Sequence, residues 1–131
     1  AVFDAVETVK MCLKVFAPML ATMTAKPENM KKAAQGGFIN ATDLADYLVK
    51  KGLPFRSAYK ISGQIVAQCI RDGLVLETLP LSEYKAYSDL FEEDLYTAID
   101  LVTCVETRIS VGGPSVADVE AQIQYVKEVI A

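Results

Sequence analysis

Residues 37–56 read GFINATDLADYLVKKGLPFR, and this stretch marks the start and the inner face of one helix. Asn40, followed three residues later by Asp43, is typical of a helix start, because short polar side chains bind the free N–H groups of a first turn. The apolar positions that come next recur at helical spacing and are predicted to face inward: Leu44, Tyr47 and Leu48.

The end of this helix is equally clear in the sequence. Lys50 and Lys51 complement the negative end of the helix dipole. Gly52 favours the left-handed backbone of a helix C-terminus, and Leu53 can make the hydrophobic contact that accompanies it. Pro54 prevents the helix from continuing, because it has no N–H and restricts the residue before it. We therefore expect a helix that ends at Lys51.

Helical spacing continues downstream. We expect a helix over 56–71, a short one over 80–87, one or two over 90–105, and a last one that Ser115 and Asp118 begin after a turn at Gly112 and Gly113. The side chains predicted to face inward are Ala58, Ile61, Ile65, Val66, Cys69, Ile70, Leu81, Tyr84, Phe91, Leu95, Ile99 and Val102, with a stripe of Val119, Ile123, Val126 and Ile130 on the last helix. No stretch alternates with a period of two, so the chain is predicted to be all-α.

Gly63 lies inside the helix expected over 56–71. A glycine in a helix interior costs up to about 1 kcal/mol relative to alanine. A close crossing with another helix would explain its presence at this position.

The first 23 residues carry two apolar rows. One row alternates spacings of four and three, as in helices of bundles: Val2, Val6, Val9, Leu13, Phe16, Leu20 and Met23. The second row lies on another face: Ala5, Cys12, Val15 and Met19. One following domain can hardly cover both faces, so we expect a bundle helix with partners on two sides.

The start of this helix has no capping residue, since Ala1, Val2 and Phe3 offer no side-chain oxygen. The expectation is therefore that the chain begins inside, or at the head of, a longer helical element. Pro18 should kink or locally open the helix. A break at Thr24 to Pro27 is the predicted domain boundary, and a short helix over 28–34 should follow it.

The composition excludes several classes of protein. The 131 residues contain no His, which removes Ser-His and Cys-His nucleophiles and His-containing zinc sites from this chain. A net charge of −4 argues against nucleic-acid binding, and no segment is apolar enough to predict a membrane span or a signal peptide. The three cysteines are far apart, and we expect buried free thiols in a reducing, cytoplasmic compartment.

No motif predicts a self-contained active site. The pairs Gly36-Gly37 and Gly112-Gly113 are isolated and favour turns over phosphate-binding loops. The acidic run Glu92-Glu93-Asp94 has the ligand type that a divalent cation prefers, but acidic residues in a helix's first turn already have a favourable dipole interaction. The structural interpretation of this run is favoured.

The stretch 37–56 also closely resembles the block that opens the C-terminal domain of argininosuccinate lyases. Residues 2–10 resemble the end of that family's long central helix, and Lys26 to Met30 resemble its usual link. Tyr87 to Asp94 and Val105 to Gly113 follow in the family's order. The chain departs from the family at Pro80 and Pro114, where a Ser or Thr commonly opens a helix. Ser82 and Ser115 are the expected substitutes.

The resemblance implies a helical C-terminal domain of a fumarase/aspartase-like lyase over 26–131, preceded over 1–25 by the end of a central-bundle helix. It implies an enzyme of arginine biosynthesis that splits argininosuccinate into arginine and fumarate by acid–base elimination, without metal or organic cofactor. It also implies a homotetramer whose subunits meet through the Val2 to Met23 helix.

The family's catalytic serine loop, catalytic His and main substrate-binding residues lie upstream of the part that this chain resembles. No catalytic, cofactor-binding or metal-binding residue is therefore assigned, and the chain alone is expected to be inactive. Four residues are candidates for buried or interfacial polar pairs: Asp43, Asp46, Arg56 and Arg108. Two alternatives stay open, a freestanding helical interaction module with this fold and a non-enzymatic relative such as a lens crystallin.

Overall fold

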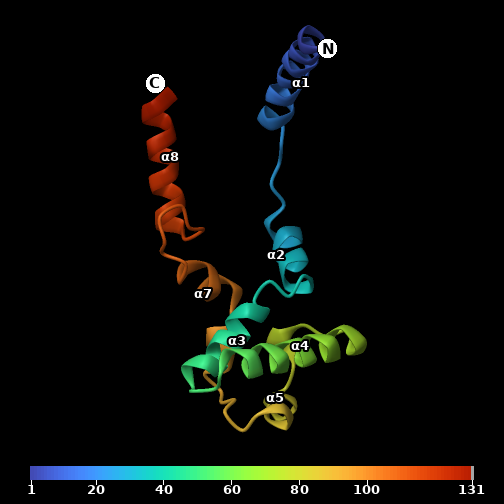
Figure 1. Ribbon diagram of the computed structural model, residues 1–131, viewed down its shortest axis with the longest axis vertical. Coiled ribbons are helices and arrows are strands. Elements are labelled where there is room, and N and C mark those ends of the chain that lie inside the picture. The colour runs from blue at the N-terminus through green and yellow to red at the C-terminus, as the bar shows by residue number, and fades with distance from the viewer. Residues whose placement is uncertain (131) are drawn as a thin grey trace. The chain divides into compact units, whose positions relative to one another are not determined.

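A computed structural model describes residues 1–130 of the chain, which form helices and no strand (Figure 1). The prediction of an all-α chain is confirmed. The elements are α1 (Val2–Ala21), α2 (Pro27–Gly36), α3 (Ala41–Lys50), α4 (Phe55–Asp72), the 3-10 turn η1 (Leu76–Thr78), α5 (Leu81–Tyr87), α6 (Leu95–Ala98), α7 (Leu101–Glu106) and α8 (Val116–Ile130). The chain divides into two compact units, Ala1–Lys31 and the residues from Lys32 on.

Helix α1 has no buried residue in this chain, and its apolar rows are exposed along its whole length. As expected from Ala1, no side chain caps its first turn. The helix runs on past Pro18 and ends at Ala21, where the Thr22 hydroxyl donates to the Pro18 carbonyl at 2.9 Å. Cys12 is exposed on this helix, which contradicts the expectation that all three thiols are buried, whereas Cys69 and Cys104 are buried.

The core of the second unit forms where α3 packs against α4 (Figure 1). The predicted inner face of α3 is confirmed, since the structure buries Leu44, Tyr47 and Leu48. The helix begins directly after Asn40, as predicted, so the helical spacing places these three side chains on one face. Helix α3 ends at Lys50, one residue before the predicted end, and Gly52 has the positive φ of 96° that a left-handed C-terminal residue needs.

Two short helices, rather than one, form in this part of the chain, and α6 packs against α3. The segment that was expected to form one or two helices over 90–105 contains α6 and α7, separated by Asp100, which caps α7 by accepting from the Thr103 N–H at 2.9 Å. This break resets the helical phase. Leu101 and Cys104 are therefore buried, whereas Val102, predicted to face inward, is exposed. Ile70 is also exposed, near the end of α4.

Helix α8 begins after Ser115, whose hydroxyl oxygen accepts from the Asp118 N–H at 3.2 Å, so this predicted cap is confirmed. Ser82 was the other expected capping residue, and this prediction is wrong. No side chain caps α5, and its first turn follows Pro80 directly. The predicted apolar stripe of α8 is exposed within this chain. None of the helices in residues 1–130 combines the length and the apolar character that crossing a bilayer requires.

No helix among the described residues crosses close to Gly63, so the expected crossing is absent from residues 1–130. A Cβ atom built on Gly63 meets no atom within 4 Å apart from the helix's own backbone, so nothing in the described chain requires glycine there.

We predict that Gly63→Ala raises the free energy of unfolding by up to about 1 kcal/mol, because it restricts the unfolded chain and fits the helix. Urea denaturation followed by circular dichroism measures this change. Gly52→Ala is the control, because its positive φ makes alanine strained there and lowers stability. A destabilised Gly63→Ala would contradict the open environment of this position.

Candidate functional site

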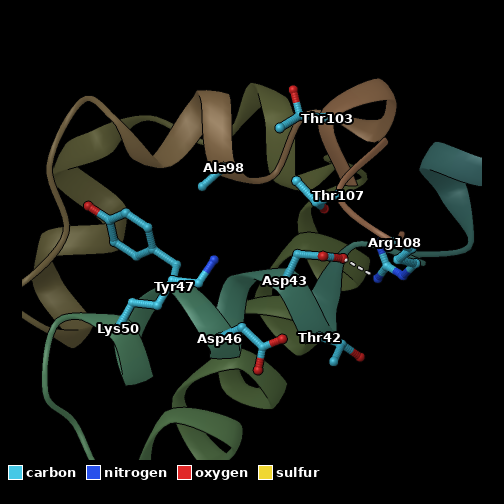
Figure 2. A pocket seen from close by; sticks show the side chains of 9 residues that line it. All are labelled: Thr42, Asp43, Asp46, Tyr47, Lys50, Ala98, Thr103, Thr107 and Arg108. Carbon is cyan, nitrogen blue, oxygen red and sulfur yellow. Dashed lines mark hydrogen bonds and ion pairs between the residues drawn. The ribbon is translucent and has the colours of Figure 1, made fainter. Parts of the chain in front are cut away.

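A polar groove lies between one face of α3 and the segment from α6 through α7 (Figure 2). Its volume is about 460 Å³, and it is lined by Thr42, Asp43, Asp46, Tyr47, Lys50, Ala98, Thr103, Thr107 and Arg108. The α3 residues come from successive turns, because positions three and four apart share one face of a helix. The lining mixes carboxylates, hydroxyls and cations, so the groove is suited to polar contacts.

The structure brings together two of the four residues singled out as polar candidates. Arg108 Nη2 and Asp43 Oδ2 lie 2.9 Å apart, and they join residues that are 65 positions apart in the chain (Figure 2). The Asp43 side chain is 15% exposed and that of Arg108 is 41% exposed. The hydrogen bond to Asp43 raises the pKa of Arg108, so the guanidinium stays charged. This pair ties the start of α3 to the loop after α7.

Arg108 is held from a second side as well. Its Nη1 group donates to the carbonyl oxygen of Cys104, one turn earlier. The Cys104 thiol in turn lies 3.5 Å from the carbonyl of Ala98. Burial is the main cause that raises the pKa of Cys104 to about 12, so the thiol is neutral and is a poor nucleophile. Cys104 therefore packs beneath Arg108 as a neutral thiol rather than as a thiolate.

The loop beyond Arg108 depends on its two glycines. Gly112 has a φ of 80°, and a Cβ on Gly113 would lie 2.4 Å from the Arg108 carbonyl oxygen. The pair thus forms a tight turn, as its isolated occurrence indicated. It allows the backbone to fold back against Arg108.

The other two polar candidates are not paired. Asp46 lines the groove, but its carboxylate makes no hydrogen bond or ion pair within the part of the chain that the structure describes. Arg56 is exposed in the first turn of α4 and does not line the groove. Whether either residue forms a pair with another chain stays a prediction.

A second polar cluster was missed in the sequence. Lys51 Nζ pairs with Glu92 and lies 3.3 Å from Asp94 Oδ2, and the hydroxyl of Tyr47 donates to Asp94. The hydrogen bond from Tyr47 is the main cause that lowers the pKa of Asp94, and the one with Glu92 is the main cause that raises the pKa of Lys51. Lys51 was interpreted only as a partner of the helix dipole, and no local pattern could have placed it against residues some 40 positions away.

Two carboxylates of the acidic run, those of Glu92 and Asp94, thus form ion pairs with Lys51. Within residues 1–130, no group of three or more carboxylate, thiol or imidazole side chains is arranged to hold a metal ion. The structural interpretation of the run fits this arrangement. The groove and the Lys51 cluster join α3 to the segment from Glu92 to Arg108 through hydrogen bonds and ion pairs.

Comparisons with known proteins agree on one family. The profile of the family described as "Argininosuccinate lyase C-terminal" matches residues 38–106. Argininosuccinate lyase of Clostridium beijerinckii is 54% identical over 131 residues, 100% of this chain. The enzyme of Acetivibrio thermocellus is 56% identical over 95% of the chain, and that of Clostridium botulinum is 57% identical over 99%.

The chain spans only part of these relatives. The matched region is 28% of the Clostridium beijerinckii protein and 27% of the Acetivibrio thermocellus protein. The remaining part of each relative has no counterpart in the 131 residues.

Proposed function

The chain belongs to the argininosuccinate lyase C-terminal family, and we propose that it is the C-terminal part of an enzyme that cleaves argininosuccinate into arginine and fumarate. The observation that carries the proposal is the identity of 54% over 100% of the chain to a protein named argininosuccinate lyase. We further propose that residues 1–25 end a central helical domain, that 26–131 form the C-terminal domain, and that the enzyme is cytoplasmic.

In this proposal, the chain has a structural role in the enzyme and does not supply the reacting groups. Elimination needs a base that removes a proton from carbon and an acid that assists departure of the arginine nitrogen. The chain has no His, Cys104 is held neutral, and Asp43 is paired with Arg108. These facts support a reaction centre that other parts of the full enzyme supply.

A chimeric enzyme tests the proposal. The matching C-terminal part of Clostridium beijerinckii argininosuccinate lyase is replaced by this chain, and release of fumarate is followed by its ultraviolet absorbance. We expect activity within about tenfold of the parent, because the chain is 54% identical to the part that it replaces and should restore the same packing, so little transition-state stabilisation is lost. The parent truncated at the junction is the control and is expected to be inactive. A folded chimera without activity would contradict the proposal.

The isolated chain provides a separate prediction. Purified alone and incubated with argininosuccinate, it should release no fumarate above the uncatalysed background, because the proposal assigns the acid and the base of the elimination to the rest of the enzyme. The same ultraviolet assay measures this, with the intact Clostridium beijerinckii enzyme as positive control. Measurable turnover by the 131 residues alone would disprove the assignment of catalysis to the rest of the enzyme.

We also propose that subunits of a homotetramer meet through the helix from Val2 to Met23. The support is its exposure: apolar side chains on both rows of α1 are open to solvent in this chain, and Leu13 of the first row is 62% exposed. Exposed apolar stripes of this length mark contact surfaces.

A further inference from the structure

Helix α4 (Figure 1) has one side in the core and one side open to solvent. The inner side packs against α3, η1 and α5, and its buried residues are Ala58, Ser62, Ile65 and Cys69. On the open side, Phe55 is 57% exposed, Tyr59 63% and Ile70 64%. Together with Gly63 they form an apolar row, because positions four, four and seven residues apart share one side of a helix.

The two aromatic rings of this apolar row adjoin each other. The ring centroids of Phe55 and Tyr59 lie 5.9 Å apart, and both rings are open to solvent. A single exposed apolar side chain is ordinary, whereas adjoining ones mark a contact surface. Aromatic side chains are also enriched at the centres of protein interfaces, since their burial removes a large apolar area from water.

Gly63 lies between the aromatic pair and Ile70. A glycine weakens the interior of a helix, and nothing in the described chain requires one at this position. Its missing side chain does allow the backbone of another helix to approach closely. Ala67, one turn later, is also small and exposed. The middle of α4 is thus shaped to receive a crossing helix.

A basic row follows the edge of the apolar row. Arg56, Lys60 and Arg71 are exposed, and each directly follows an apolar residue of that row in the sequence. None of the three forms an ion pair with the residues that the structure describes. Charges at the rim of an apolar contact select partners of opposite charge. The chemistry of this face therefore fits a helix with an apolar side and carboxylates along its edge.

We propose that such a helix, from the part of the enzyme that has no counterpart in the 131 residues, crosses α4 at Gly63. The inference rests on the proposed function, and its support is the length of the relatives: the matched region is 28% of the Clostridium beijerinckii protein. The crossing helix covers Phe55 and Tyr59, and its carboxylates pair with the basic row. Arg56, singled out as a candidate for an interfacial pair, then has its partner.

Thiol labelling tests whether this face is covered in the enzyme. Ala67→Cys places a thiol one turn beyond Gly63, and its reaction with N-ethylmaleimide is followed by mass spectrometry of peptides, which separates it from the exposed native Cys12. The rate is compared between the isolated chain and the chimera with Clostridium beijerinckii argininosuccinate lyase. We expect labelling to be at least about tenfold slower in the chimera, because a covered thiol reacts only when the contact opens.

Ala86→Cys is the matched control for labelling. Ala86 is exposed on α5, and its labelling should be equally fast in both proteins. Equal rates for Ala67→Cys in the two proteins would overturn the proposal. Protection that grows with the concentration of the isolated chain would assign the face to a second copy, also against the proposal. Activity of the unsubstituted chimera tests the proposed function, whereas labelling reads the contact without it, so the two can fail separately.

A larger side chain at the crossing provides a second measurement. Gly63→Gln should not lower the stability of the isolated chain, because the position is open and glutamine favours a helix. In the chimera the same side chain enters the contact and should lower the urea concentration that halves the activity. Ala86→Gln is the control and should leave this concentration unchanged. A chimera that tolerates Gly63→Gln would contradict the close crossing.

Charge reversal tests the acidic edge of the crossing helix. Lys60→Glu places a carboxylate against the proposed carboxylates, so it should lower the same urea concentration, and less so at high salt. Lys85→Glu, at an exposed position of α5, is the control and should have no such effect. An unchanged or raised urea concentration for Lys60→Glu would disprove an acidic partner.

Discussion

Replacing Phe91 with alanine should lower the free energy of unfolding by about 3–5 kcal/mol, the range for an aromatic side chain removed from a packed core. The Phe91 ring is fully buried at the point where three segments meet. It stacks parallel to Tyr47 at 5.9 Å between ring centroids and lies 5.1 Å from Tyr84. Its removal leaves a cavity that these rigid rings cannot fill without losing their own hydrogen bonds.

Those hydrogen bonds explain why the cavity would persist. The Tyr84 hydroxyl donates to the Leu76 carbonyl at 2.7 Å, and the Tyr47 hydroxyl donates to Asp94. Both rings are therefore anchored at their polar ends, and collapse toward the space left by Phe91 would break one of these bonds. Cavity formation is costly when the surroundings relax only partly.

Urea denaturation of Phe91→Ala measures the loss, and Phe55→Ala is the matched control. Phe55 is 57% exposed at the start of α4, so the same substitution there should change the free energy of unfolding by less than about 1 kcal/mol. Similar losses for the two variants would show that Phe91 is not the centre of the core.

The isolated chain should self-associate through α1. In sedimentation equilibrium its apparent mass should exceed the 14.3 kDa of one chain and rise with concentration, because the apolar rows of α1 are exposed. The double variant Leu13→Glu with Phe16→Glu should shift the chain to a monomer, since burying two carboxylates in an apolar contact is strongly disfavoured.

Lys14→Glu is the control for this experiment. It introduces the same residue on the same helix but outside both apolar rows, so association should persist. A native chain that stays strictly monomeric at high concentration would contradict the proposed contact surface.

The start of α3 and its inner face could be predicted because their causes are local. Gly52 and Pro54 mark the end of the helix, and the spacing of Leu44 and Leu48 sets its inner face. Asn40 directly precedes the first helical residue, as predicted, but its side chain makes no capping bond there. Each of these effects acts between residues within about two turns of one another, where the chain itself holds the partners together. Family membership followed from the same stretch.

Predictions that needed the phase of two successive helices were less successful. Val102 was assigned to the core because the apolar period was carried through 90–105 as one pattern. The Asp100 cap interrupts it, and Leu101 and Cys104 take the inner positions. The capping residue was visible in the sequence, but a helix of four residues, α6, has too few positions to show its own period.

Interactions between neighbours in the chain explain the helical class, the end of α3, the inner face of this helix and the two apolar rows of α1. The packing of distant segments explains the pair of Arg108 with Asp43 and the cluster of Lys51 with Glu92 and Asp94. It also explains why Asn40 binds Glu77 instead of capping its helix. A polar side chain has several possible partners of similar energy, and the choice depends on which distant segments the packed core brings within about 3 Å of it.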